Sequence, residues 1–132
     1  MIIDASAIIA ILRNELDAAF FARKIANATN RRISAANFVE AAVVIDASRD
    51  PIASRRFDDL LGEASVSIEP VTRRQALIAR EAYRDFGKGS GHPAKLNFGD
   101  CFAYALAKEM NEPILCKGNK IMHTDIASIV PS

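Results

Sequence analysis

Short apolar segments alternate with helical segments along this chain of 132 residues, and the alternation is the feature that most limits its fold. The segments that we expect to form strands are residues 1–4, 31–34, 65–70, 113–116 and 127–130. Each is followed or preceded by a segment in which apolar residues recur with the period of a helix. The pattern predicts an α/β fold with a mainly parallel sheet of four to five strands, flanked by helices on both faces.

The expected helices fill the gaps between these strands. They cover residues 6–12, about 15–28, a stretch after Ser34, and residues 52–61, 72–86 and 100–110. Asn14 and Ser34 are candidate N-caps, and Gly62 is expected to end the helix before it. The length is that of one domain, so residues 1–132 are predicted to form a single domain.

Composition limits the function classes. The chain has 17 Lys and Arg residues against 16 Asp and Glu, a net charge of +1, which excludes a strongly basic protein that coats nucleic acid non-specifically. The apolar start is interrupted at Asp4 and Arg13 and is not expected to be a secretory signal. No apolar run approaches the roughly 20 residues of a membrane helix. Cys101 and Cys116 are expected to be reduced core thiols, which favours a cytoplasmic protein without a membrane partner.

Four acidic residues lie where a parallel sheet would gather a site. Asp4 ends the first strand inside an apolar run, and Asp100 opens a late helix. Glu40 lies on the helix after the second strand. We expect its side of the helix to face the core, because the apolar residues Val43 and Val44 lie on the same side. Asp125 follows the fourth strand. Since sites in such sheets form at the carboxyl ends of the strands, these acids are expected to converge.

Each acid has an ordinary explanation when taken alone. An Asp at a helix start is usually an N-cap, and a Glu on an apolar face usually reaches outward to solvent. Together they imply more, because two like charges about 4 Å apart repel by roughly 4 kcal/mol at an effective dielectric constant of about 20. Converging carboxylates therefore favour a hard divalent cation, Mg²⁺ or Mn²⁺, of the kind that activates water for phosphodiester cleavage.

Several motifs resemble one known family. They are Asp4-Ala5-Ser6-Ala7 after the first strand, Glu40 within NFVEAAVVI, LNFGDC at residues 96–101, Gly118-Asn119, and His123-Thr124-Asp125-Ile126. In order and spacing these motifs resemble the PIN domain family and, more narrowly, the VapC toxins of bacterial toxin–antitoxin pairs. The resemblance runs along essentially the whole chain, and it implies a PIN-like three-layer fold.

The resemblance also implies a function. Proteins of this kind are endoribonucleases that use Mg²⁺ or Mn²⁺ to cut structured RNA such as tRNA or ribosomal RNA. They form homodimers, and a VapB-type antitoxin inhibits them with a C-terminal segment that occupies the active-site groove. By position, Asp4, Glu40 and Asp100 would bind the metal and Ser6 would support them by hydrogen bonding. Asp125 would be a fourth acid, with Thr124 supporting it.

One departure from the family pattern concerns activity. The family usually carries an acid shortly before the Thr-Asp pair, and here that place is held by Lys120. A lysine would put a positive charge beside the acids and would replace or repel a second metal ion. The sequence therefore leaves open an alternative, a catalytically weakened or inactive PIN-fold protein that acts by binding RNA or its antitoxin.

Two further interpretations concern the rest of the chain. The loop 88–95 carries Lys88, His92 and Lys95, which are candidates for contact with RNA phosphates or, equally, an ordinary solvated connection. A phospho-acceptor receiver domain is the other small α/β fold that we considered. It would need an acceptor Asp at the end of a central strand, but Asp58 and Asp59 lie in an expected helix, so the sequence disfavours it.

Overall fold

The structure, a computed structural model, describes residues 1–131. The strands in chain order are β1 (Ile2–Ile3), β2 (Arg32–Ser34), β3 (Ser67–Glu69), β4 (Ile114–Leu115) and β5 (Ser128–Ile129). The helices are α1 (Ala5–Leu12), α2 (Ala18–Asn27), α3 (Ala35–Asp46), α4 (Pro51–Glu63), α5 (Arg73–Phe86) and α6 (Phe98–Met110), with a short 3₁₀ helix, η1 (Ile121–His123). All of the predicted strands and helices are present.

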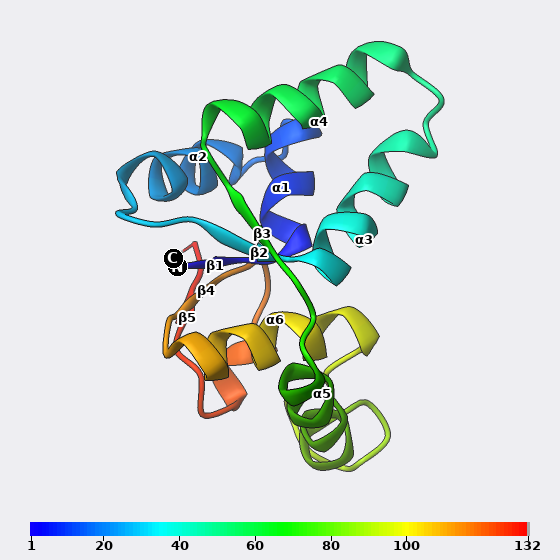
Figure 1. Ribbon diagram of the computed structural model, residues 1–132, viewed down its shortest axis with the longest axis vertical. Coiled ribbons are helices and arrows are strands. Elements are labelled where there is room, and N and C mark those ends of the chain that lie inside the picture. Colours follow the sequence, from blue (N-terminus) through cyan, green and yellow to red (C-terminus); the bar gives the residue numbers. More distant parts are fainter. Residues whose placement is uncertain (132) are drawn as a thin grey trace.

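The five strands form one all-parallel sheet in the order β3-β2-β1-β4-β5. Helices α1 to α4 cover one face of this sheet, and α5 and α6 cover the other (Figure 1). The prediction of an α/β, three-layer arrangement with a mainly parallel sheet is therefore confirmed. On each face the sheet is covered by helices that connect its parallel strands, as parallel pairing requires.

Two apolar cores lie on the two faces of the sheet. Ile2 and Ile114 are paired across β1 and β4 and pack with α5 and α6. Their neighbours Ile3 and Leu115 pack with α1 to α4. The separation follows from the strand, in which successive side chains point to opposite faces. All four side chains are fully buried, so the centre of the sheet is held from both sides.

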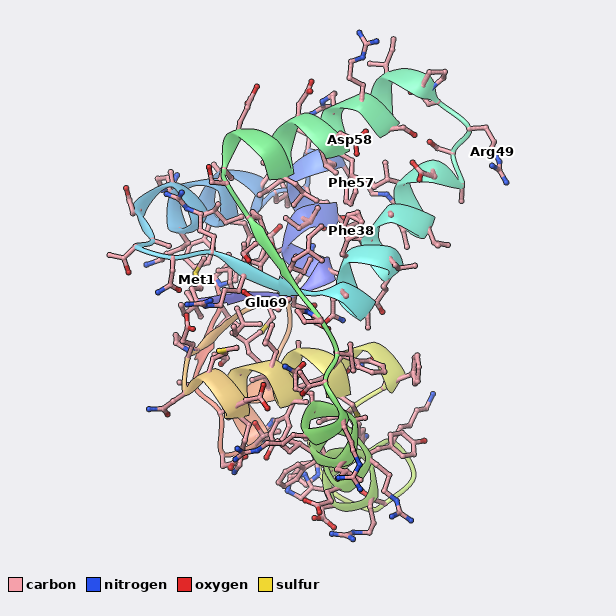
Figure 2. The ribbon with its side chains drawn as sticks, viewed as in Figure 1. Met1, Phe38, Arg49, Phe57, Asp58 and Glu69 are labelled. Carbon is pink, nitrogen blue, oxygen red and sulfur yellow. The ribbon has the colours of Figure 1, made fainter. Side chains whose placement is uncertain are left out.

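Helices α3 and α4 form a hairpin that extends from the sheet. Phe38 on α3 and Phe57 on α4 point toward one another between the two helices, with ring centroids 5.5 Å apart (Figure 2). Arg49 lies in the turn that joins them, at the far end of the hairpin (Figure 2). This turn includes a left-handed residue, since Arg49 has a φ of 56°.

Some predicted helix boundaries are wrong. The second helix starts at Ala18 instead of residue 15, and Asn14 is not its N-cap: its φ of 51° places it in a left-handed turn after α1. Gly62 does not end the helix before it, because α4 continues to Glu63. The last helix begins at Phe98, two residues earlier than predicted. Ser34 caps α3 as predicted, accepting from the Ala36 amide.

The predicted core face of α3 is also wrong. Glu40 and Val43 are exposed, and the buried residues of the helix are Asn37, Ala41 and Ile45. These three recur at i, i+4 and i+8, so the helix is rotated relative to the expectation by about one position. Glu40 consequently lies at the edge of the packed face, from which its carboxylate can reach a neighbouring element.

The carboxyl ends of the central strands meet at the starts of two helices. Asp4 follows β1 and is the N-cap of α1, and Ser34 ends β2 and is the N-cap of α3. Cys116 follows β4 directly and is buried. Among residues 1–131, none of the helices has the length and apolar character needed to cross a membrane.

Candidate active site

Asp4 is a nearly buried carboxylate at the end of the central strand, 9 % exposed. Its Oδ2 accepts hydrogen bonds from the Ser6 amide at 3.0 Å and from the Ser6 hydroxyl at 2.6 Å. The same hydroxyl oxygen accepts from the Lys117 amide, at 3.0 Å. Ser6 thus fixes the orientation of the Asp4 carboxylate and ties it to the end of β4. The predicted hydrogen bond is present, and its catalytic importance stays a prediction.

Asp100 is held by the start of α6. Asn97 and Asp100 form a capping box, in which the Asn97 side chain accepts from the Asp100 amide and the Asp100 carboxylate accepts from the Asn97 amide, each at 2.9 Å. The Asp100 Oδ2 that accepts from Asn97 also accepts from the Lys120 ammonium, at 3.3 Å. The side chain of Asp100 is 17 % exposed, so one edge of this carboxylate stays open.

Glu40 reaches from α3 to the start of α6. The buried Asn37 side chain donates to Glu40 Oε1 at 3.2 Å and to the Gly99 carbonyl at 2.9 Å, which links the two helices. The Glu40 carboxylate lies against the Cα of Gly99, where any larger residue would place a Cβ on top of it. A glycine at this position is therefore what allows Glu40 to approach its neighbour Asp100.

The charges of the three acids affect one another. Burial raises the pKa of Asp4, and the charge of Asp100 raises it further, although the hydrogen bonds from Ser6 oppose the change. Glu40 is exposed as a residue, but its carboxylate is partly shielded from water against Gly99. This desolvation raises the pKa of Glu40, and the charges of Asp4 and Asp100 raise it further. The buried Cys116 thiol senses the same two charges: burial, then Asp4 and Asp100, raise its pKa to about 12.

The donor chemistry of this cluster fits a hard divalent cation. Asp4, Glu40 and Asp100 offer only carboxylate oxygens, and their mutual repulsion is what a cation would relieve. Within residues 1–131 no three such side chains already stand in a ligating arrangement. The Asp100 carboxylate accepts from Asn97 and Lys120, and the Glu40 carboxylate accepts from Asn37.

Asp125 and Thr124 lie in different surroundings. The Asp125 carboxylate accepts from the Tyr104 hydroxyl at 2.6 Å and from the Lys108 ammonium at 2.5 Å. Partial burial by itself would raise the pKa of Asp125. The hydrogen bonds from Lys108 and Tyr104 outweigh this effect, so the pKa is lowered. The Thr124 hydroxyl donates to the Ile121 carbonyl and accepts from the Ile126 amide, so it shapes the turn after η1. The structure does not bring either residue into contact with the other three acids, and their roles stay predictions.

The loop that precedes α6 presents two exposed cationic side chains. Lys88 and Lys95 are exposed, whereas His92 is half-buried: its ring packs on Phe86 at 4.9 Å and its Nδ1 accepts from the Ala94 amide. His92 therefore shapes the loop. A groove of about 570 Å³ between α5 and α6 runs from Lys88 to Asn97, the cap of Asp100.

Sequence reasoning missed two contributors to the site, Asn37 and Gly99. The contact of Lys120 with Asp100 agrees with the positive charge that was predicted beside the acids. A signal for Asn37 was present, since it precedes Glu40 by three residues and so lies beside it on one helix face. Gly99 was visible only as the neighbour of Asp100, because its role depends on a residue that is distant in the chain.

Comparison with known proteins identifies the family of this chain. The PIN domain profile matches residues 1–126. Ribonuclease VapC28 of Mycobacterium tuberculosis is 59% identical over 126 residues, which are 96% of this chain and 95% of that protein. Two solved structures share the fold at low identity. VapC20 of M. tuberculosis, a toxin that cleaves the sarcin–ricin loop, aligns with a TM-score of 0.76 at 13% identity, covering 98% of each chain.

The second structure is a toxin–antitoxin complex from Klebsiella pneumoniae. It aligns with a TM-score of 0.75 at 14% identity and covers 99% of this chain and 97% of that one. Both likenesses establish the PIN-like fold, while the family follows from the profile match and from the identity to VapC28 over nearly the full length of both proteins. The chain therefore belongs to the PIN domain family and, within it, to the VapC ribonucleases.

Proposed function

We propose that this VapC ribonuclease is an endoribonuclease that cuts structured RNA with the help of Mg²⁺ or Mn²⁺. The observation that carries the proposal is the placement of three acids at one edge of the sheet: Asp4 at the end of β1, Glu40 against Gly99, and Asp100 in the first turn of α6. Three acids at the carboxyl end of a parallel sheet are costly to maintain without a compensating cation. The sarcin–ricin loop specificity of VapC20 makes a folded ribosomal RNA hairpin a suitable first substrate.

Different residues of the chain are proposed to bind the ion, to orient its ligands and to contact the RNA. Asp4 and Asp100, with Glu40, would hold the ion, and Ser6 keeps the Asp4 carboxylate in one orientation. Asn37 does the same for Glu40. When bound, a divalent ion supplies a more acidic water and offsets the negative charge of the phosphodiester. The exposed Lys88 and Lys95 are proposed to contact the RNA backbone on the approach to Asp100.

The test is RNA cleavage by the Asp100→Asn variant. Asn keeps the size of the side chain and can still accept from the Asn97 amide, so the fold should survive. We expect a loss of Mg²⁺- or Mn²⁺-dependent cleavage larger than the roughly 10–100-fold that loss of a supporting partner costs. Asp125→Asn in the same assay measures whether Asp125 acts as a fourth acid. Cleavage at the original rate by a folded Asp100→Asn protein would remove Asp100 from the proposed site.

A second candidate function is favoured by the contact between Lys120 and Asp100. An ammonium group that permanently neutralises Asp100 would weaken ion binding and leave a protein that binds RNA or its antitoxin without cutting. The Lys120→Asp variant separates the two candidates. A large gain in cleavage over the unmodified protein favours the binding-only function, and little or no gain favours the active nuclease.

We further propose that the chain is the toxin of a toxin–antitoxin pair, acting in the cytoplasm as a homodimer. The Klebsiella complex supports an antitoxin partner, because it shares this fold along the whole chain. The expected partner is a small VapB-type protein whose C-terminal segment enters the groove beside Asp100. Co-purification with the product of an adjacent reading frame, with loss of RNA cleavage on binding, tests this part. Light scattering on the free protein tests the homodimer.

A further inference from the structure

Lys120 is the one cationic side chain that contacts the acid cluster in the described residues. Its Nζ is 3.3 Å from Asp100 Oδ2, and its side chain is 43 % exposed. The nearby Lys117 is engaged elsewhere, with Glu15 at 2.5 Å and Asp17 at 3.6 Å. Within the described residues, the positive charge in contact with the acids therefore comes from Lys120 alone, and it contacts only Asp100.

The backbone holds Lys120 in this place. It immediately precedes η1, where its carbonyl accepts from the His123 amide, and the next residue, Ile121, is buried in the core under α6. The side chain thus starts from a fixed point, and its reach to Asp100 is set by the fold. This makes the ammonium group a built component of the site.

The charges of the cluster favour one ion and disfavour two. Asp4, Glu40 and Asp100 are three acids, and the Lys120 ammonium offsets one of them, which leaves two negative charges for one divalent cation to balance. The Lys120 ammonium lies 3.3 Å from Asp100 Oδ2, so a second divalent cation bound to the Asp100 carboxylate would lie close to this positive charge or displace it. The positive charges of a second cation and of the Lys120 ammonium would repel each other strongly, because a partly buried site screens charges less than water does.

We propose that the Lys120 ammonium occupies the position that a second cation would take at Asp100, so that the active site binds a single divalent ion. This inference rests on the proposed metal-dependent function. Lys120 acts through Asp100 and is a positioning residue. Its role is to supply permanently a positive charge that would otherwise come from a second, exchangeable ion.

The experiment counts Mn²⁺ ions on the purified chain by isothermal titration calorimetry and by electron paramagnetic resonance, without RNA. The unmodified protein should bind one Mn²⁺. Lys120→Asp should bind two, and Lys120→Ala should bind its first ion at least tenfold more tightly. Lys117→Ala is the matched control, since Lys117 is also an exposed lysine near this edge of the sheet, and its affinity should change less than twofold.

The outcomes separate this inference from the proposed function. Two ions bound by the unmodified protein, or an unchanged stoichiometry and affinity in both Lys120 variants, would overturn the single-ion proposal. Either result leaves metal-dependent cleavage intact, because that is measured on Asp100→Asn. If the unmodified protein binds no Mn²⁺, the proposed metal-dependent function fails as well, and this outcome is distinct from the binding of two ions, which overturns the single-ion proposal alone.

Discussion

Asp4 shows what a buried carboxylate costs the fold. It is 9 % exposed, it is affected by the charge of Asp100, and its carboxylate accepts hydrogen bonds from the amide and the hydroxyl of Ser6. Burial therefore raises its pKa, which means that the folded chain binds this proton more tightly than the unfolded chain does. The free energy of unfolding must then decrease as pH rises from the ordinary Asp range through the raised pKa of the folded state.

We therefore predict that Asp4→Asn is more stable than the unmodified protein at pH 7 in the absence of divalent ions. The amide removes the buried charge and can still accept from Ser6, so the melting temperature should rise by a few degrees. The gain should shrink as pH is lowered through the raised pKa of Asp4, because Asp4 itself then becomes protonated. Thermal melts across this pH range test the prediction. Asp58→Asn, on the exposed side of α4, should show no comparable gain.

At the scale of elements, the site depends on how closely α3 approaches α6. The contact is made by Asn37, which bonds both Glu40 and the Gly99 carbonyl, and by the missing side chain of Gly99. The sequence predicted both helices and the acid that each carries, because helical periodicity and capping are local signals. It did not predict which face of α3 is buried, since Val43 is as apolar as Ile45 and only packing against the sheet distinguishes them.

The close approach gives a second prediction. Gly99→Ala should displace the Glu40 carboxylate, because the added Cβ would overlap it, and RNA cleavage should fall by about 10–100-fold, the cost of disturbing a supporting contact. The matched control is Gly62→Ala. Gly62 also lies inside a helix, and its Cβ would meet nothing within 4 Å, so this variant should cleave normally and gain about 0.5–1 kcal/mol of stability. Equal activity of the two variants would mean that the position of Glu40 does not matter.

At the scale of the whole molecule, the three acids come from both sides of the sheet. Asp4 lies between β1 and α1, Glu40 lies on α3 in the layer of α1 to α4, and Asp100 opens α6 in the opposite layer (Figure 1). Order along the chain was enough to predict this convergence, because parallel strands direct their carboxyl ends to one edge. The sequence could not predict that Asp125 bonds to Tyr104 and Lys108. These two residues lie one turn apart on α6 and are distant from Asp125 in the chain, so the contact depends on how the segment after β4 packs on α6.

An ion held by these acids would join the two helical layers, so it should stabilise the folded protein as a whole. Binding to the folded state alone adds about 2.7 kcal/mol at a concentration 100 times the dissociation constant. We predict that the melting temperature of the unmodified protein rises progressively with Mn²⁺ and returns to its starting value on chelation. Asp100→Asn should respond far less, because it loses the ligand from α6. Experiments at constant ionic strength separate this specific effect from general screening of surface charge. A response of the same size in Asp100→Asn would show that the ion binds elsewhere and that the two layers are held together by their apolar cores alone.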